Sequence, residues 1–394
     1  MAVAPVGAAS GATLAWRACP GVDDPRLRCA SLKVPLDHAR PAGPTIDIMI
    51  SRLAATDPTL RRGVLITTGG GPGGAGVPEP LNLAAVVDPA VRARYDIVGF
   101  DMRFVERSTP ITCGQPEEEP GGYWVRTATY QSLEDTAVEA RAYARACARH
   151  AGWALPFATT AQAARDMDAI RAVLGERKLS FLGGSYVAML GVAYGTILPH
   201  LVDRFVLDSP VNYDLASRPY ELERLPAFEE NYAAFTRYLA ENNATFGLGV
   251  TPTEVAETLS EVVAEAAIDP IVAGDHAWTA GELGSLTVIA TYFAQLWPVV
   301  AADPCAFWPV SRDNTPPLAR NRAPAALVVA ALRDASVPPA NSIATARAIA
   351  GSRPVTVGKQ THVPLLSGQA NACLAGTVTD HLARGRLPKH DTAC

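Results

Sequence analysis

The sequence lacks several features that would assign it to particular classes of protein. It has no apolar run approaching the ~20 residues that a membrane-spanning helix needs. Its 34 Lys and Arg are matched by 39 Asp and Glu spread along the chain, for a net charge of −5, which excludes the basic face of a nucleic-acid binder. We therefore expect neither a membrane nor a nucleic acid as partner.

Sequence patterns for a metal site or a signal peptide are also missing. No two of the seven cysteines have Cys-x-x-Cys spacing, and the opening MAVAPVGAASGATLAW has no basic stretch followed by an apolar one. Either the protein stays inside the cell or a leader has been removed. The wide cysteine spacing favours disulfides in an oxidising compartment, although seven reduced, buried cysteines are the alternative. The sequence-local pairs are Cys19/Cys29, Cys113/Cys147 and Cys373/Cys394, with Cys305 left over.

What the sequence does contain is a set of short apolar runs separated by helical patterns. Runs of this length typify strands buried on both faces of a parallel sheet. Alternation with helices predicts an α/β fold with a mainly parallel, doubly wound sheet. The runs cover 63–68, 95–101, 179–184, 204–209, 326–332 and 353–358, and the helical patterns include 133–150, 160–175 and 340–351.

Between the fourth and fifth runs, over 100 residues break this rhythm. Amphipathic helical patterns at 218–243 and 251–267 predict an inserted helical cap. We place the cap at 212–300 and the α/β core at 1–211 and 301–394. The cap would cover the carboxyl edge of the sheet, where ligands of open α/β sheets bind.

The string FLGGSYVAMLG places Ser185 between a predicted strand and a predicted helix. A nucleophile elbow needs this strand–turn–helix context, in which the N–H of the following residue, Tyr186, can face an oxyanion. The usual pattern is G-x-S-x-G, but Val187 stands where the last glycine belongs. The competing interpretation is that Ser185 is only a helix N-cap.

The order Ser…Asp/Glu…His of this fold selects the other catalytic candidates. Asp334 follows the fifth apolar run, and His362 follows the sixth, where a loop can reach the serine. Asp334 would orient the imidazole and stabilise its charged form. Asp208 is second choice, because an aspartate there more often bonds loop amides. His381 and His390 are expected to be solvated.

The glycine-rich string TTGGGPGGAG follows the first of these strands. Glycines let a backbone approach a ligand closely, so we expect Gly71, or Gly70 beside it, to give the second oxyanion donor. A phosphate-binding loop is excluded because neither G-x-G-x-x-G nor G-x-x-x-x-G-K-[ST] occurs, and Pro72 removes a donor.

Together these strings resemble the actinobacterial tripeptidyl aminopeptidase and proline iminopeptidase-like α/β-hydrolases over nearly the whole chain. The similarity rests on WRAC and RCASLKVPLDH (16–38), GGPGGAG (70–76), YDIVGFDMRFVERSTPITC (95–113), ACARHAG (146–152), the segment 160–186 and PHLVDRFVLDSP (199–210). The resemblance implies an α/β-hydrolase fold and a secreted serine exopeptidase that removes short N-terminal peptides or residues. It also implies no metal or cofactor, and a triad of Ser185, Asp334 and His362.

The departures from this family concentrate near the expected site. Members usually read G-x-S-Y-G-T around the serine and D-P-R-G-x-G-x-S after the second strand, and have glycine after the histidine. This chain has Val187, Phe104, Glu106 and Val363 at those glycines. Clustered changes suggest a different substrate or loss of peptidase activity, and we expect Phe104, Glu106, Val187 and Glu229 to contact the substrate.

Three hypotheses follow. A peptidase would need an acidic group for the substrate's α-ammonium, because an unpaired buried charge is costly; the candidates are Glu106, Glu221, Glu223, Glu229 and Glu230. A hydrolase or acyl-transfer enzyme for esters, lactones or thioesters could use the same triad. A pseudo-hydrolase would bind a ligand or promote a non-hydrolytic step. The substrate would be a small molecule or short peptide, and the sequence does not indicate the oligomeric state.

Overall fold

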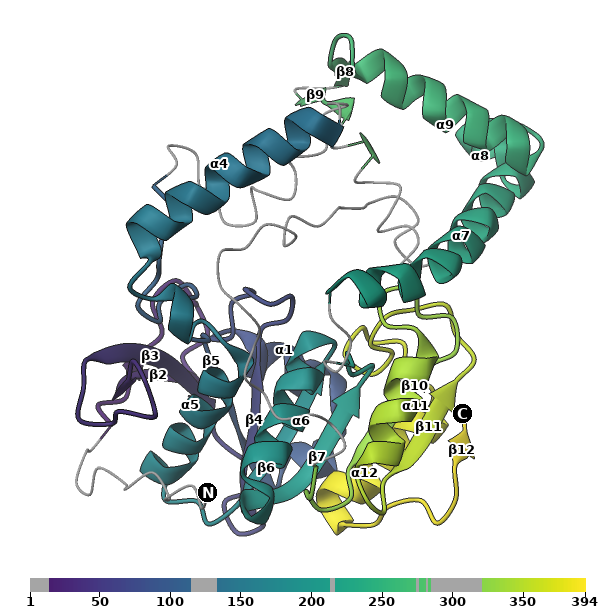
Figure 1. Cartoon of the computed structure of the whole chain (residues 1–394). Coiled ribbons are helices and arrows are strands. Elements are labelled where there is room, and N and C mark those ends of the chain that lie inside the picture. Colours follow the sequence, from purple (N-terminus) through teal and green to yellow (C-terminus); the bar gives the residue numbers. More distant parts are fainter. Residues whose placement is uncertain (1–13, 115–132, 213–216, 274–275, 281–282, 285–320) are drawn as a thin grey trace.

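The computed structural model describes residues 14–114, 133–212, 217–273, 276–280, 283–284 and 321–394. Its centre is a ten-stranded sheet with the order β1-β2-β3-β5-β4-β6-β7-β10-β11-β12 (Figure 1). The strands are β1 (Arg17–Ala18), β2 (Leu27–Pro35), β3 (Thr45–Leu53), β4 (Gly63–Thr68), β5 (Tyr95–Phe100), β6 (Leu179–Gly184), β7 (Val202–Asp208), β10 (Leu327–Ala331), β11 (Arg353–Val357) and β12 (Thr392–Ala393).

The parallel part of the sheet consists of the six predicted strands together with β12. The strands β4, β5, β6 and β10 are buried along their whole length because their side chains alternate between two apolar cores. Val64 and Ile66 of β4 pack into one core and Leu65 into the other. This two-sided burial explains why the runs read as continuously apolar, and it confirms the expected α/β fold.

The sequence reading missed the antiparallel strands β1, β2 and β3, which extend the sheet beyond β5. β2 alternates between buried and exposed residues over most of its length, the pattern of a strand with one solvated face. Because these strands are not continuous apolar runs, the apolar pattern of the sequence did not predict them.

Helices cover both faces of the sheet. Apolar residues of α5, α6 and α11 fill one core, and those of α1 and α12 fill the other. The elements are α1 (Glu79–Val86), α2 (Pro89–Arg92), η1 (Leu155–Phe157), α5 (Thr160–Val173), α6 (Tyr186–Ile197), η2 (Pro199–Leu201), α11 (Pro339–Ala348) and α12 (Ala372–Arg384).

The prediction that His381 is solvated is wrong. It lies on the face of α12 that carries Leu374, Val378 and Leu382 into the core, and it is 3% exposed. Burial lowers the pKa of its imidazole from 6.5 to about 4. His390, in contrast, is exposed in the C-terminal segment.

The segment after β7 leaves the sheet. It forms α7 (Ser217–Glu241), α8 (Asn243–Phe246), α9 (Pro252–Ala266), β8 (Ile271–Ala273) and β9 (His276–Trp278). Phe235, Leu239 and Val255 join α7 to α9 in a small core of their own. α4 (Leu133–Ala151) projects from the same end of the sheet (Figure 1).

The helix α7 contacts the α/β core at the loop that carries Asp334. Asn231 Nδ2 donates to the carbonyl of Arg333 (3.3 Å), and Asn341 Nδ2 of α11 donates to Glu223 Oε2 (3.1 Å). The inserted helices therefore stand over the carboxyl ends of the strands. The domain limits 212–300 and 301–394 remain predictions, because 285–320 lies outside the described residues.

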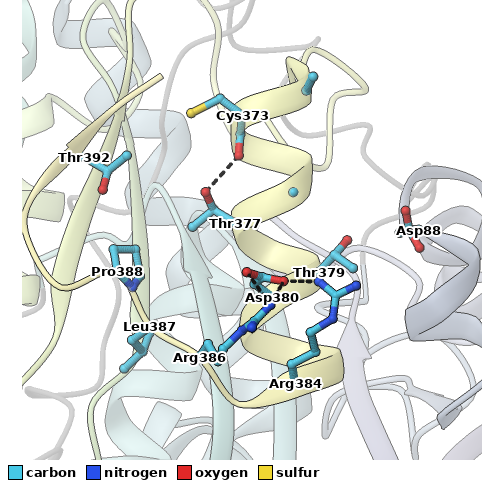
Figure 2. A pocket seen from close by; sticks show the side chains of 12 residues that line it. Asp88, Cys373, Thr377, Thr379, Asp380, Arg384, Arg386, Leu387, Pro388 and Thr392 are labelled. Atoms are coloured by element: carbon cyan, nitrogen blue, oxygen red, sulfur yellow. Dashed lines mark hydrogen bonds and ion pairs between the residues drawn. The ribbon is translucent and has the colours of Figure 1, made fainter.

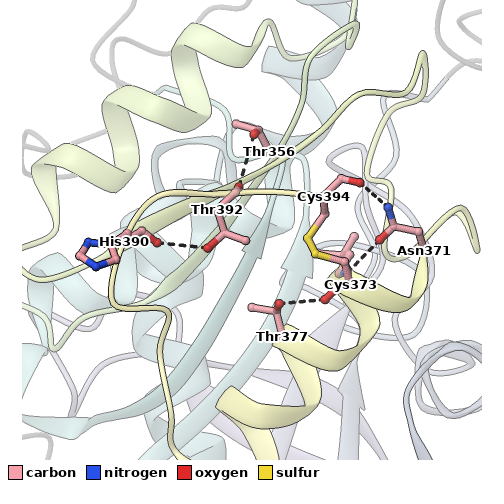
Figure 3. Close-up of a disulfide and its surroundings, with 8 residues drawn as sticks. Thr356, Asn371, Cys373, Thr377, His390, Thr392 and Cys394 are labelled. Carbon is pink, nitrogen blue, oxygen red and sulfur yellow. Dashed lines mark hydrogen bonds between the residues drawn. A yellow bond between two sulfur atoms is a disulfide. The ribbon is translucent and has the colours of Figure 1, made fainter.

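All three predicted disulfides are present: Cys19–Cys29, Cys113–Cys147 and Cys373–Cys394. Figure 3 shows the last of these fastening α12 to the C-terminal residue, where Asn371 also donates to the carbonyl of Cys394. Cys305 lies outside the described residues. None of the described helices is long and apolar enough to span a membrane.

Candidate active site

Ser185 stands at a strained turn between β6 and α6. Its φ of 56° and ψ of −126° lie where L-residues other than glycine are rarely found. Its side chain makes no capping hydrogen bond to α6, so the interpretation of Ser185 as an ordinary N-cap is not supported. This strained strand–turn–helix geometry is the one that a nucleophile elbow requires.

Asp334 and His362 are joined by a buried hydrogen bond. The imidazole Nδ1 lies 2.8 Å from Oδ2 and 3.1 Å from Oδ1 of Asp334. Oδ1 also accepts from the N–H of Val337 (2.9 Å), and the aspartate is fully buried. Because Nδ1 donates to the carboxylate, the basic nitrogen of a neutral ring is Nε2.

The histidine loop packs directly against the elbow. A Cβ placed on Gly184, the residue before Ser185, would lie 2.7 Å from Cγ1 of Val363 and 2.8 Å from Cδ1 of Leu366. A side chain at 184 would therefore push this loop away. The structure thus brings together the elbow of Ser185 and the loop of His362.

Asp208, the second-choice acid, holds loop amides, as expected for an aspartate at that position. Its Oδ2 accepts from the N–H groups of Leu365 (2.9 Å) and Leu366 (3.2 Å), and its own carbonyl accepts from the N–H of Ser185 (2.9 Å). Burial raises the pKa of its carboxyl from 3.8 to about 7.

The glycine loop is built so tightly that some of its glycines admit no side chain. A Cβ on Gly76 would lie 1.7 Å from the carbonyl oxygen of Phe100, and one on Gly69 would lie 2.2 Å from that of Gly74. Gly71 is exposed at a φ of 115°, and no atom lies within 4 Å of a Cβ on Gly70. Gly70 and Gly71, the two predicted oxyanion donors of this loop, therefore lie on its exposed part.

Two buried charged residues, Asp101 and Arg103, hold the loops beside the site, and neither was predicted from the sequence. Asp101 Oδ1 accepts from the N–H groups of Gly76 (2.8 Å) and Val77 (3.0 Å). Arg103 donates to both carboxylate oxygens of Asp166 at 2.7 Å. Their position in the sequence could have indicated them, because both lie within three residues of the end of β5, at the edge of the sheet where ligands bind.

The residues predicted to contact substrate lie in different surroundings. Phe104 and Val187 are 8% and 2% exposed and belong to a large apolar core, and the Phe104 ring meets Trp153 edge to face at 5.8 Å. Glu106 and Glu229 are exposed.

The remaining glutamate candidates all lie on α7. Glu230 is exposed, and Glu223 accepts the bond from Asn341. The side chain of Glu221 lies outside the described part of the molecule.

Three of the positions where the resembled family has glycine are held in the left-handed region. The φ angles are 69° at Phe104, 47° at Glu106 and 46° at Val363. The backbone has thus kept a glycine-favouring shape after the glycines were replaced, at a cost of about 1–3 kcal/mol per strained residue.

One hollow on the surface is unrelated to this site. It measures about 720 Å³ and lies between α12 and the C-terminal segment, where Asp380 pairs with Arg384 and Arg386 (Figure 2). Its lining includes none of Ser185, Asp334 and His362.

Comparison with known proteins identifies the family. A tripeptidyl aminopeptidase of Streptomyces lividans is 30% identical over 455 aligned residues, which cover 93% of this chain and 83% of that protein. The chain belongs to the tripeptidyl aminopeptidase family. The profile described as TAP-like protein matches residues 290–394.

Two further similarities were found. Serine protease Hip1 of Mycobacterium tuberculosis is 31% identical over 254 residues, covering 63% of this chain and 47% of that protein. The crystal structure of a proline iminopeptidase from Mycobacterium smegmatis is 15% identical with a TM-score of 0.46, covering 91% of this chain and 100% of that one. As a tripeptidyl aminopeptidase family member, the chain is an enzyme, a serine hydrolase with the α/β-hydrolase fold.

Proposed function

We propose that this enzyme is a serine exopeptidase that releases short peptides from the N-termini of its substrates through an acyl-enzyme on Ser185. The observation that carries the proposal is the buried Asp334–His362 pair, whose loop packs against the strained Ser185 elbow. This combination supplies a nucleophile, a base and the group that orients the base.

In the first half-reaction, Nε2 of His362 takes the proton from Ser185 as Oγ attacks the scissile carbonyl. The imidazolium then protonates the departing amine, which leaves the N-terminal peptide as an ester on Ser185. In the second half-reaction, His362 takes a proton from water as the water attacks this ester, and then returns the proton to Oγ of Ser185 as the peptide leaves with a free carboxyl group. Asp334 keeps Nδ1 protonated and stabilises the imidazolium in both halves.

The developing oxyanion needs two fixed donors. Tyr186 is the first residue of α6, where the N–H groups of a helix point outward from its start, and its N–H is the first proposed donor. Gly71 in the glycine loop is the second proposed donor, with Gly70 as the alternative. The bonds from Gly76 and Val77 to Asp101 hold this loop, so the donor is positioned before the substrate binds.

An exopeptidase must also recognise the charged N-terminus of its substrate. Glu106 and Glu229 carry exposed carboxylates, and either could pair with an α-ammonium. Phe104 and Val187 are buried in the apolar core, so they would support the wall of the pocket from behind and not meet the substrate directly. We assign residues 212–300 as the cap that limits the length of the bound peptide.

The three disulfides support an oxidising, extracytoplasmic location for the enzyme. An intracellular location is the alternative. Thiol titration of protein taken directly from its native compartment distinguishes the two, since an oxidising compartment leaves the six paired cysteines unreactive.

The proposal is tested with matched panels of tripeptide p-nitroanilides and p-nitrophenyl acyl esters, with the wild type, Ser185→Ala and the exposed-strand control Ser31→Ala. An exopeptidase releases p-nitroaniline from free-N-terminus tripeptides, loses this activity in Ser185→Ala and keeps it in Ser31→Ala. Turnover of esters alone would assign the same triad to ester hydrolysis. Turnover of neither panel would favour a non-hydrolytic role.

A further inference from the structure

We propose that Asp208 is a positioning residue for hydrolysis, because this single residue holds the nucleophile elbow with its main chain and the histidine loop with its carboxylate. The proposal deepens the proposed function and rests on it. Asp208 ends β7, the strand next to β6 in the sheet, and pairs in register with Gly184.

The first connection runs to the nucleophile. The carbonyl of Asp208 accepts the N–H of Ser185 at 2.9 Å. This bond extends the parallel pairing of Gly184 with Asp208 by one residue, up to the point where the φ of 56° turns the chain out of the strand. The main chain of Asp208 thus fixes the position from which Ser185 leaves the sheet.

The second connection runs to the base. Oδ2 of Asp208 accepts the N–H groups of Leu365 and Leu366, three and four residues after His362. Leu366 also packs against the space above Gly184. The two bonds hold the histidine loop on the elbow, and the Ser185–His362 geometry therefore depends on the side chain of Asp208.

The carboxyl of Asp208 is fully buried, and its Oδ1 has no hydrogen-bond partner in the described part of the chain. Oδ2 is therefore the oxygen that holds the histidine loop. Burial raises the pKa of the carboxyl most, the positive charge of His362 lowers it, and Asp334 raises it. Those two side chains come from the loops after β11 and β10, whereas the facing β6 residues Gly183 and Gly184 carry no titratable group.

The role of the Oδ2 acceptor is isolated by two substitutions. Asp208→Asn keeps an oxygen for the N–H groups of Leu365 and Leu366. The histidine loop therefore stays on the elbow, and kcat should stay close to the wild-type value. Asp208→Ala removes the acceptor, and the released loop lowers kcat by about 10²-fold while KM stays near the wild-type value.

The control is Asp96→Asn. Asp96 is also a buried aspartate of the sheet that accepts a loop N–H, from Ala55 at 2.8 Å, but it lies near the start of β5, away from Ser185. Rates are expressed per active site titrated with a fluorophosphonate, so that unfolded protein does not count. Asp96→Asn should lower stability without moving kcat.

The outcomes are distinct. A lower kcat per titrated site in Asp208→Ala, with kcat kept in Asp208→Asn, supports the proposal. Wild-type kcat in Asp208→Ala, or an equal loss in both variants, overturns it, while loss of activity in Ser185→Ala leaves the proposed function standing. If Asp208→Ala does not fold, Asp208→Ser, whose shorter side chain does not reach both N–H groups, takes its place in the same comparison. Full activity in Ser185→Ala would remove both proposals.

Discussion

Val187 occupies the space that a side chain on Gly183 would need. A Cβ on Gly183 would lie 2.5 Å from Cγ1 of Val187, whose side chain is 2% exposed in the core. The glycine of the family motif G-x-S-x-G is thus replaced by valine without displacing the elbow, because the residue two positions before Ser185 has no side chain. The valine side chain at 187 therefore fits beneath the turn, next to Gly183, and Ser185 has the strained φ of an elbow serine.

Glu106→Gly should make the protein more stable and its peptidase activity weaker. Glycine relieves the strain of a φ of 47°, which we expect to raise the free energy of unfolding by about 1 kcal/mol. If Glu106 binds the substrate's ammonium, KM for free-N-terminus peptides rises and KM for N-acylated ones does not. Chemical denaturation and steady-state kinetics measure the two effects.

The control for this experiment is Glu257→Gly on the exposed face of α9. In a helix interior glycine costs about 1 kcal/mol, so this variant should be less stable. Equal losses of stability in both variants would contradict the assignment of strain to position 106.

Gly76→Ala should prevent the glycine loop from forming. Its methyl group would lie 1.7 Å from the carbonyl oxygen of Phe100 in the neighbouring strand, a contact that only displacement of the backbone can relieve. Gly70→Ala is the matched control in the same loop, since no atom lies within 4 Å of its Cβ. Thermal melting should show a large loss for the first variant and a small change for the second; similar melting temperatures would contradict the loop's structure.

The parallel sheet could be predicted because its strands read as apolar runs separated by helices. Ser185, Asp334 and His362 could be proposed as catalytic residues because each follows one of these runs. Asp101 and Arg103 could have been noted from their position after a strand, but their partners Gly76 and Asp166 could not be predicted, because pairings between distant segments leave no local pattern. His381 was misassigned for a related reason: one polar residue on an apolar helix face does not reveal whether the face is buried.

Buried His381 should make the protein sensitive to acid. Its pKa is about 4 in the folded protein against an ordinary 6.5, so the unfolded chain binds the proton more strongly between these values. The stability contributed by the neutral ring is complete above pH 6.5 and is lost as the pH falls towards 4. By pH 5 the loss is about 2 kcal/mol.

This loss is measured by urea unfolding at pH 7 and pH 5. His381→Leu should flatten the difference between the two, whereas His390→Leu, at an exposed position, should leave it unchanged. An unaltered pH dependence in His381→Leu would show that another group is responsible.

Asp334→Asn should nearly abolish turnover while the fold is retained. The amide can donate to Nδ1 instead of accepting from it, which places the proton on Nε2 and leaves Ser185 without a base; the expected loss in kcat is about 10³–10⁴-fold. Asp23→Asn, at an exposed position, is the control. If Asp334→Asn were as active as this control, the acid would have to lie elsewhere.

The measurement that tests the account most directly is the rate and position of fluorophosphonate labelling. We predict a single adduct on Ser185, located by peptide mass mapping, and a labelling rate that falls at least about 10³-fold in His362→Ala, since an unassisted serine hydroxyl is a weak nucleophile. An adduct on another residue, or an equal rate in His362→Ala, would contradict the claim that these two side chains form one catalytic unit.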